Sequence, residues 1–343
     1  MNSKDIKEVK SLLTRPKKIV IVSHRNPDGD AYGSSLALYH YLVKLKHNVV
    51  VVSPNDSPDF LKWLPGVEDI IIFETNTKKA SELLRDADII FTLDFNALHR
   101  VGAAMQKILE SVSSIYIMVD HHQQPDSYAK FMFSDPSACS TSQMIYQFLE
   151  KIDGLDVIDK TIATCIYTGI VTDTGSFKYQ STTSETHRII ASLIDIGIEH
   201  TKIHNNLYDT NSYNRLQLLG KALRNLKTLP QYNTAYISLS QREMNLHHFK
   251  KGDTEGFVNY ALSLKDVVLA VIFIEDQKQG IIKMSLRSKG YFSVNNFARK
   301  HFNGGGHENA AGGRSEESLQ DTISKFLKII PTYENELKES YEI

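Results

Sequence analysis

Five short apolar runs alternate with helical segments along the first half of the chain. Each run is apolar on both faces, which is typical of strands in a parallel sheet that helices cover on both sides. The runs are KIVIVS (18–23), NVVVVS (48–53), DIIIF (69–73), DIIFTL (88–93) and IYIMV (115–119). Residues 31–46 and 98–111 between them have apolar side chains at helical spacing. The alternation predicts an α/β fold with a doubly wound, mostly parallel sheet, whose ligands bind beyond the carboxyl ends of the strands.

The second half of the chain has a different pattern. Residues 140–226 are mostly helical in spacing, and strands return at 234–240, 266–275 and 280–288, followed by helices at 294–302 and 317–330. A length of 343 residues exceeds what one hydrophobic core usually organises. We therefore expect the sheet domain over 1–198, a helical connection over 199–228 and a smaller α+β domain over 229–343.

The composition, with 41% apolar and 23% charged residues, excludes a disordered or low-complexity chain. No run approaches the roughly 18–20 apolar residues of a membrane helix. The charged N-terminus lacks the apolar core of a signal peptide, so we expect a cytoplasmic protein. Cys139 and Cys165 are too few for a disulfide framework and are expected as reduced thiols in buried helices.

The net charge of −1 conceals an asymmetry between the two halves. Residues 1–200 carry 20 basic and 25 acidic side chains, whereas residues 201–343 carry 19 and 15. The segment 278–314 contains seven Lys or Arg residues and only one acidic residue, Glu308. Taken alone, an excess of one charge usually means only a solvated surface. The asymmetry also fits an acidic half that binds cations, joined to a basic half that binds an anion.

Carboxylates and imidazoles collect at four places, three of them where a predicted strand ends. The residues are His24, Asp28 and Asp30, then Asp94, then Asp120, His121 and His122, and finally Asp173 after a helix. Considered singly, an Asp before a helix is usually an N-cap, and a His pair is usually packing. Gathered at one sheet edge, however, the acids would repel one another unless cations neutralised them. The sequence therefore predicts a metal site.

The mixture of ligands limits the metal. Carboxylates and imidazoles without a thiolate favour a hard to borderline divalent ion. Two ions about 3.5–4 Å apart that share one carboxylate would use the whole set, and such a pair stabilises the entering and leaving oxygens of a displacement at phosphorus.

Four motifs carry a family resemblance. HRNPDGDAYGS, a lone Asp after a later strand, VDHH and TDTGSF, in this order, resemble the motifs of the DHH phosphoesterase superfamily. In the tail, GGGHENAAGG (304–313), preceded by SLRS (285–288), resembles the DHHA1 substrate-binding domain. A chain of this length with these two domains is most similar to the NrnA-like group of nanoRNase/pAp phosphatases.

The resemblance implies a role for each position in the first half. His24, Asp28 and Asp94 would bind one divalent cation, and Asp30, His121 and Asp173 the other, with Asp94 bridging. The cations implied are Mn²⁺, with Mg²⁺ and Co²⁺ as alternatives. His122 would donate to the scissile phosphate, so that it acts in catalysis together with Asp30 and Asp94. Asp120 would orient a neighbouring imidazole from behind. Arg100 would either reach a phosphate or pair with an acid.

The tail would hold the substrate. Gly304, Gly305 and Gly306 would approach an anion with bare backbone N–H groups, and His307 would add a directed donor. Arg287 would contact a terminal phosphate with two N–H groups. Phe177 and Tyr179 are candidates for stacking a base or for core packing.

The implied activity is hydrolysis of oligoribonucleotides of about two to five nucleotides, linear dinucleotides included, and of pAp to AMP and phosphate. The partners expected are therefore short RNA or a nucleoside bisphosphate, with no membrane; a homodimer is left open. The alternatives are a RecJ-like single-strand exonuclease, a family II pyrophosphatase, a membrane-anchored cyclic-dinucleotide phosphodiesterase and a catalytically silent metal-dependent nucleotide-binding module. A RecJ-like enzyme would be expected to have an added nucleic-acid-binding domain, and the membrane-anchored phosphodiesterase to have transmembrane and sensory segments. The tail of the pyrophosphatase lacks the GGGHxxAAG motif, and a silent module would be expected to have lost a metal ligand.

Overall fold

The computed structural model describes residues 3–341, and the chain forms two compact units that divide between Thr210 and Asn211. This division lies inside the stretch 199–228. The helix α8 (His200–Tyr208) belongs to the first unit, and α9 (Tyr213–Arg224) belongs to the second.

The first unit is built on a six-stranded sheet in which every pair of neighbouring strands is parallel. Its order is β3 (Ile71–Ile72), β2 (Asn48–Ser53), β1 (Lys18–Val22), β4 (Ile89–Leu93), β5 (Ile115–Asp120) and β6 (Phe131–Ser134). The five predicted runs are confirmed as strands. The sixth strand, β6, was not predicted, because FMFS is short and only alternate side chains of it are buried.

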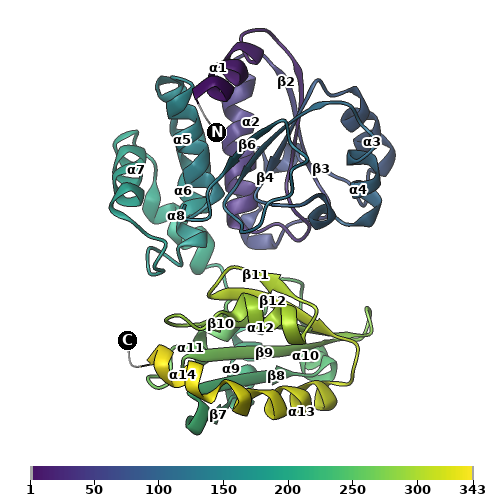
Figure 1. Ribbon diagram of the computed structural model, residues 1–343, viewed down its shortest axis with the longest axis vertical. Coiled ribbons are helices and arrows are strands. Elements are labelled where there is room, and N and C mark those ends of the chain that lie inside the picture. Colours follow the sequence, from purple (N-terminus) through teal and green to yellow (C-terminus); the bar gives the residue numbers. More distant parts are fainter. Residues whose placement is uncertain (1–2, 342–343) are drawn as a thin grey trace. The chain divides into compact units, whose positions relative to one another are not determined.

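Helices cover both faces of this sheet, as the apolar runs require (Figure 1). Ile19 and Ile21 of β1 belong to the larger core cluster, together with side chains of α2 (Gly29–Lys44), α5 (Thr141–Lys151), α6 (Lys160–Asp173) and α7 (Ser184–Asp195). The helix α7 joins this cluster by packing against α5 and α6. Val20 and Val22 point to the opposite face and pack with α3 (Thr77–Asp86) and α4 (Ala103–Leu109). The first helix, α1 (Ser3–Leu12), joins the larger cluster through Val9. The predicted helix over 98–111 is interrupted, because Gly102 with φ 87° separates a short 3-10 turn from α4.

Two glycines let α2 and α6 touch at their backbones. A Cβ on Gly33 of α2 would lie 2.7 Å from the carbonyl oxygen of Cys165 and 2.8 Å from the nitrogen of Gly169, both on α6. A side chain at Gly33 would therefore push the helices apart, whereas one at Gly169 would meet Ser142 of α5 and the carboxylate of Asp30. The contact matters because Asp30 lies in the first turn of α2 and Asp173 in the last turn of α6.

The second unit contains a mixed six-stranded sheet. Its order is β11 (Gly305–Gly306), β12 (Ala310–Ser315), β10 (Ile281–Ser288), β9 (Leu269–Asp276), β8 (Thr234–Leu239) and β7 (Lys227–Leu229). All neighbours are antiparallel except β8 and β9. The three predicted strands are confirmed, whereas β12 was not predicted.

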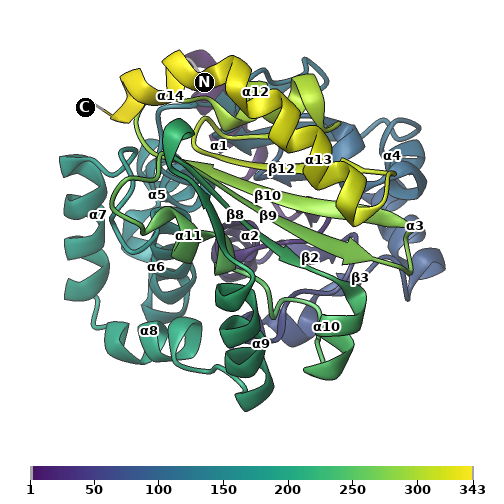
Figure 2. The same cartoon turned by 90° about the horizontal axis from the view of Figure 1, so that it is seen from below.

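Helices again lie on both faces of this second sheet (Figure 2). One face packs with α9 and α11 (Phe257–Leu262), and α10 (Gln241–Leu246) adds Met244 to the same core. The other face packs with α12 (Val294–His301), α13 (Leu319–Ile329) and α14 (Glu334–Tyr341). The α12 and α13 helices confirm the two helices predicted in the tail.

Both cysteines are buried and neither forms a disulfide, as predicted. Cys165 lies in α6, but Cys139 precedes the N-cap of α5 rather than lying in a helix. Within residues 3–341, no helix combines the length and the apolar composition that crossing a bilayer requires.

Candidate metal centre

Polar side chains from four segments converge at the carboxyl end of the parallel sheet in the first unit. His24 follows β1, Asp94 follows β4 and His121 follows β5. Parallel neighbours end at the same edge, so the order β1–β4–β5 places these three residues next to one another. The ends of α2 and α6 add Asp30 and Asp173.

Asp94 is common to two groups of side chains. Its Oδ2 lies 3.4 Å from His24 Nε2, which in turn lies 3.9 Å from Asp28 Oδ1. Its Oδ1 lies 3.5 Å from His121 Nε2. Each group offers ligand atoms close enough together to hold one ion: His24, Asp28 and Asp94 form the first, and Asp30, Asp94 and His121 the second.

Asp173 joins the second group through its Oδ2, which lies 3.4 Å from His121 Nε2. Asp30 Oδ2 lies 3.9 Å from the same nitrogen. The six residues expected as metal ligands are therefore brought together, with Asp94 between the two groups.

Local backbone geometry positions the two acids nearest His24. Asp28 is the N-cap of α2, and its Oδ1 accepts the N–H groups of Asp30 and Ala31 at 3.1 and 3.0 Å. The plain structural role of Asp28 is thus confirmed, and the same cap holds its carboxylate beside His24. Asp94 has φ 65°, a left-handed conformation that Asp tolerates better than most residues.

The orientation of the imidazoles fits metal binding. His24 Nδ1 lies 2.9 Å from the carbonyl oxygen of Arg25, and His121 Nδ1 lies 3.2 Å from that of Ala138. A carbonyl oxygen only accepts hydrogen bonds, so each Nδ1 carries a proton and donates it. Each Nε2 therefore faces the carboxylates, which is the arrangement found for histidines that ligate metals.

The electrostatics of the cluster also fit a cation. Burial and the carboxylates of Asp94 and Asp173 raise the pKa of Asp30 well above its ordinary value. Burial would raise the pKa of Asp94 too, but hydrogen bonds from His121 and His24 hold it well below its ordinary value. Burial would lower the pKa of His24, yet its hydrogen bond with Asp94 raises it to about 8. These buried acids compete for the same imidazole protons, and a divalent cation would relieve that competition.

A second group of side chains adjoins the metal centre. The buried carboxylate of Asp120 accepts a hydrogen bond from His122 Nδ1 at 2.7 Å, so the imidazole that Asp120 orients is His122. Arg100 Nη2 lies 3.5 Å from His122 Nε2. Within residues 3–341, no ion pair joins the Arg100 guanidinium to an acid, and its contact with a phosphate stays a prediction.

The first turn of α5 contributes contacts that the sequence did not reveal. Asp30 accepts the backbone N–H groups of Thr141 and Ser142, and the Thr141 hydroxyl donates to Asp94. The only signal in the sequence was Ser140, a residue type that favours the N-cap of a helix. That signal predicts where α5 begins but not what its first turn contacts.

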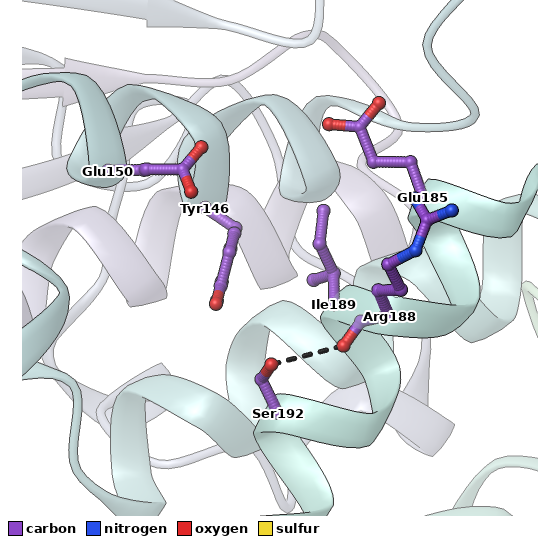
Figure 3. Close-up of a pocket in the computed structure, with 6 residues that line it drawn as sticks. All are labelled: Tyr146, Glu150, Glu185, Arg188, Ile189 and Ser192. Atoms are coloured by element: carbon purple, nitrogen blue, oxygen red, sulfur yellow. Dashed lines mark hydrogen bonds between the residues drawn. The ribbon is translucent and has the colours of Figure 1, made fainter.

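Phe177 is partly buried and packs against the core of the first unit, with its ring centroid 6.4 Å from that of Tyr167 and 5.5 Å from that of His187. Of the two aromatic candidates, only Tyr179 is exposed, at 38%. Figure 3 shows a separate surface pocket of about 300 Å³ between α5 and α7, lined by Tyr146, Glu150, Glu185, Arg188, Ile189 and Ser192. None of the predicted site residues lines that pocket.

The glycine-rich segment of the second unit is a closed hairpin. Gly306 pairs with Ala311, and the His307 N–H donates to the carbonyl oxygen of Ala310 at 2.7 Å. A Cβ on Gly304 would lie 2.0 Å from the carbonyl oxygen of Gly312. The hairpin itself therefore requires a residue without a side chain at position 304.

Two of the three glycine N–H groups are already bonded within the second unit. Gly304 donates to the carbonyl oxygen of Ala298, and Gly306 donates to Asn295 Oδ1, both at 3.2 Å. The expectation that all three offer bare N–H groups to an anion is therefore wrong for these two. Arg287 and His307, both of intermediate exposure, retain side chains suited to an anion.

Comparisons with known proteins identify two family domains in the chain. Residues 18–170 match the N-terminal domain of the DHH family, and residues 241–334 match the DHHA1 domain. A bifunctional oligoribonuclease and PAP phosphatase NrnA from Thermus thermophilus is 31% identical over 295 residues, covering 86% of this chain and 83% of that protein. The protein of the same name from Bacillus subtilis is 28% identical over 305 residues, covering 86% and 88%.

A solved structure resembles the chain over nearly its whole length. The crystal structure of an exopolyphosphatase-related protein from Bacteroides fragilis matches with a TM-score of 0.94 and 41% identity, covering 98% of both chains.

Proposed function

The chain belongs to the DHH family of phosphoesterases and carries a DHHA1 domain, and on this premise we propose that it hydrolyses short oligoribonucleotides, the bisphosphate pAp, or both. The substrate class is supported by the two relatives named as oligoribonucleases and PAP phosphatases at 31% and 28% identity. The observation that carries the proposal is the position of Asp94, one buried carboxylate between two groups of ligands.

In this proposal the six converging side chains hold two divalent cations. The first set is His24, Asp28 and Asp94, and the second is Asp30, Asp94, His121 and Asp173. Bound divalent cations supply Lewis-acid chemistry, because they lower the pKa of water and neutralise charge on phosphoryl oxygens. The preference for Mn²⁺ over Mg²⁺ and Co²⁺, the number of ions and a cytoplasmic location stay predictions.

His122 and Arg100 would bind the phosphoryl group that reacts. The buried Asp120 carboxylate holds His122 Nδ1–H at 2.7 Å, so the orientation of the ring is set before a substrate arrives. The imidazole would bind a phosphoryl oxygen through its Nε2 side. The guanidinium of Arg100, at 3.5 Å from that nitrogen, would donate to the same group.

The second unit would bind a different part of the substrate. The segment 278–314 has seven basic residues and one acidic residue, which favours an anion. Arg287 and His307 would bind a terminal phosphate, whereas Gly305 is paired with Gly312 inside the hairpin. A site for a terminal phosphate would favour short substrates over long strands.

A substrate panel tests this function. The purified protein with Mn²⁺ is incubated with pAp, labelled di- to pentanucleotides, an oligonucleotide of about 24 residues and pyrophosphate. We expect rapid hydrolysis of pAp or of the short oligonucleotides, and complete loss of that activity in excess EDTA. The Asp94→Asn variant, purified in parallel, controls for contaminating nuclease.

The other outcomes of the panel identify the alternatives. Degradation of the long oligonucleotide alone would support a RecJ-like exonuclease, and consumption of pyrophosphate alone would support a pyrophosphatase. Mn²⁺-dependent nucleotide binding without hydrolysis of any substrate would support the silent module. Each of these results contradicts the proposal.

A further inference from the structure

The first turn of α5 contacts two carboxylates at once. The Thr141 N–H donates to Asp30 Oδ2 at 2.6 Å, and the Ser142 N–H donates to Asp30 Oδ1 at 2.8 Å. The Thr141 hydroxyl donates to Asp94 Oδ1 at 3.0 Å. All four residues are at most 2% exposed, so these bonds form out of contact with water. Thr141 is therefore the one residue of α5 that is bonded to both carboxylates.

The start of α5 is built so that these donors face the metal centre. Ser140 is the N-cap and accepts the N–H of Gln143 at 3.0 Å, which closes the first turn from within. The N–H groups of the first two helical residues have no partner inside a helix, so they need one elsewhere. Here Asp30 is that partner, and the positive end of the helix dipole stabilises its carboxylate.

The same turn is also tied to the helix on its other side. Gln143 Oε1 accepts a hydrogen bond from the Thr186 hydroxyl of α7 at 2.7 Å and lies 3.0 Å from Cys139 Sγ. Gln143 and Thr186 are both buried. The first turn of α5 is thus fixed from two directions, and it cannot follow a shift of Asp30 or Asp94 without breaking buried bonds.

The bonds leave each carboxylate with one defined direction in which to bind. Each oxygen of Asp30 accepts one N–H and keeps lone pairs for a further partner, and its Oδ2 lies 3.9 Å from His121 Nε2. Asp94 Oδ1 accepts from Thr141 and faces His121, whereas its Oδ2 faces His24. A carboxylate that serves two sites needs this control of its rotation about the Cβ–Cγ bond.

We propose that Thr141 is a positioning residue of the metal centre: its hydroxyl fixes the rotation of Asp94, while its N–H and that of Ser142 fix Asp30. The spacing of the two carboxylates is then set before a cation binds, and the affinity for the cation depends on it. This inference rests on the metal-binding part of the proposed function and not on the identity of the substrate.

Three variants test the proposal. Thr141→Val keeps the shape of the side chain and removes the hydroxyl, and Thr141→Ser keeps the hydroxyl. Thr168→Val is the matched control, because the Thr168 hydroxyl is equally buried but donates only to the backbone carbonyl of Thr164, at 2.8 Å. Thr141→Ala replaces Thr141→Val if the valine variant does not fold.

Mn²⁺ binding is measured by titration calorimetry on the full chain without substrate. We expect Thr141→Val to bind Mn²⁺ about 10–100-fold more weakly, the range for partners of metal ligands, and Thr141→Ser and Thr168→Val to bind within about threefold of the wild type. With the substrate found in the panel, Thr141→Val should need more Mn²⁺ for half-maximal kcat, while KM at saturating Mn²⁺ stays unchanged.

Unchanged Mn²⁺ affinity in a folded Thr141→Val variant would overturn the proposal, and so would an equal loss in Thr168→Val, which would reflect general destabilisation. The calorimetric result does not depend on turnover. A protein that binds Mn²⁺ with the expected order of affinities but hydrolyses nothing would support the role of Thr141 and contradict the proposed function. A wild-type protein that binds no Mn²⁺ would contradict both.

Discussion

Asp30 and Asp94 in the first unit are 1% and 2% exposed, whereas Arg287 and His307 in the second unit are of intermediate exposure. The acids are held by buried hydrogen bonds from a helix terminus, while Arg287 and His307 extend from strand and hairpin positions whose backbone is already paired. Buried charge requires a permanent counterion at fixed spacing, because an uncompensated charge is costly away from water. Half-exposed charge can bind and release an anion, since water solvates it in the meantime. The two units therefore suit a resident cation and a transient substrate.

Substitution of Asp94 should have the largest effect, because this buried acid of the first unit belongs to both groups of ligands. Asp94→Asn keeps the size of the side chain but removes the charge shared by both groups of ligands. We expect kcat to fall more than about 100-fold, which exceeds the usual effect of changing a ligand's partner. Steady-state kinetics and a Mn²⁺ titration measure this. An Asp94→Asn variant with near-normal activity would show that the shared carboxylate is not needed.

Substitutions at Gly169 of α6 and Gly220 of α9 compare how closely a helix is packed in each unit. A Cβ on Gly169 would lie 1.8 Å from Ser142 Oγ and 2.7 Å from Asp30 Oδ1, so Gly169→Ala should lower the free energy of unfolding by about 1–3 kcal/mol and weaken Mn²⁺ binding. A Cβ on Gly220 of α9 would meet nothing within 4 Å, so Gly220→Ala should raise stability by about 0.5–1 kcal/mol. Urea unfolding measures both. Equal effects of the two substitutions would remove this contrast between the units.

His307 tests the substrate side of the comparison. His307→Ala should raise KM about tenfold for substrates with a terminal phosphate, the usual value of a hydrogen bond to a charged group. Affinity for Mn²⁺ and KM for the same oligonucleotide without that phosphate should not change. Equal losses on both substrates would argue against a terminal-phosphate role for this residue.

Substitution of Glu243 in the second unit has the smallest expected effect, a loss of stability that depends on pH. Burial would raise its pKa, but hydrogen bonds from Ser240, Asn225 and Lys221 lower it to about 2. A lowered pKa means that the carboxylate stabilises the fold fully above its ordinary pKa of 4.5 and progressively less as the pH falls towards 2. Glu243→Gln should therefore cost about 1 kcal/mol at pH 7, as loss of a capping residue does, and less at pH 3. Urea unfolding at the two pH values checks this; a cost that does not shrink at pH 3 would contradict the pKa.

The strands that could be predicted from the sequence are those in which the apolar pattern of the strand's own residues requires a covered strand. The run KIVIVS is apolar on both faces, so only a covered strand satisfies it. The residues of β12, AAGGRS, have little strand preference and form one only because β10 and β11 pair with them from both sides. Such pairing is a property of the whole sheet and leaves no local pattern.

The site shows the same limit. The converging acids and imidazoles were recognised because their residue types report their chemistry. Thr141 was missed because its bonds to Asp30 and Asp94 depend on where the start of α5 lies in the fold, and a threonine at the start of a helix gives no local sign of such contacts. The sequence also left open whether the glycine run serves a ligand or the chain itself, and the structure shows that the hairpin needs Gly304 on its own account.

The contact between Gly33 and Gly169 places main-chain atoms, not side chains, between α2 and α6. The separation of Asp30 from Asp173 is therefore set by atoms that every residue type shares. Substitutions on the outer surfaces of the two helices can accumulate without altering that separation, whereas a single added methyl group at the crossing would alter it. The spacing of these two carboxylates is thus independent of the residue types on the outer surfaces of α2 and α6.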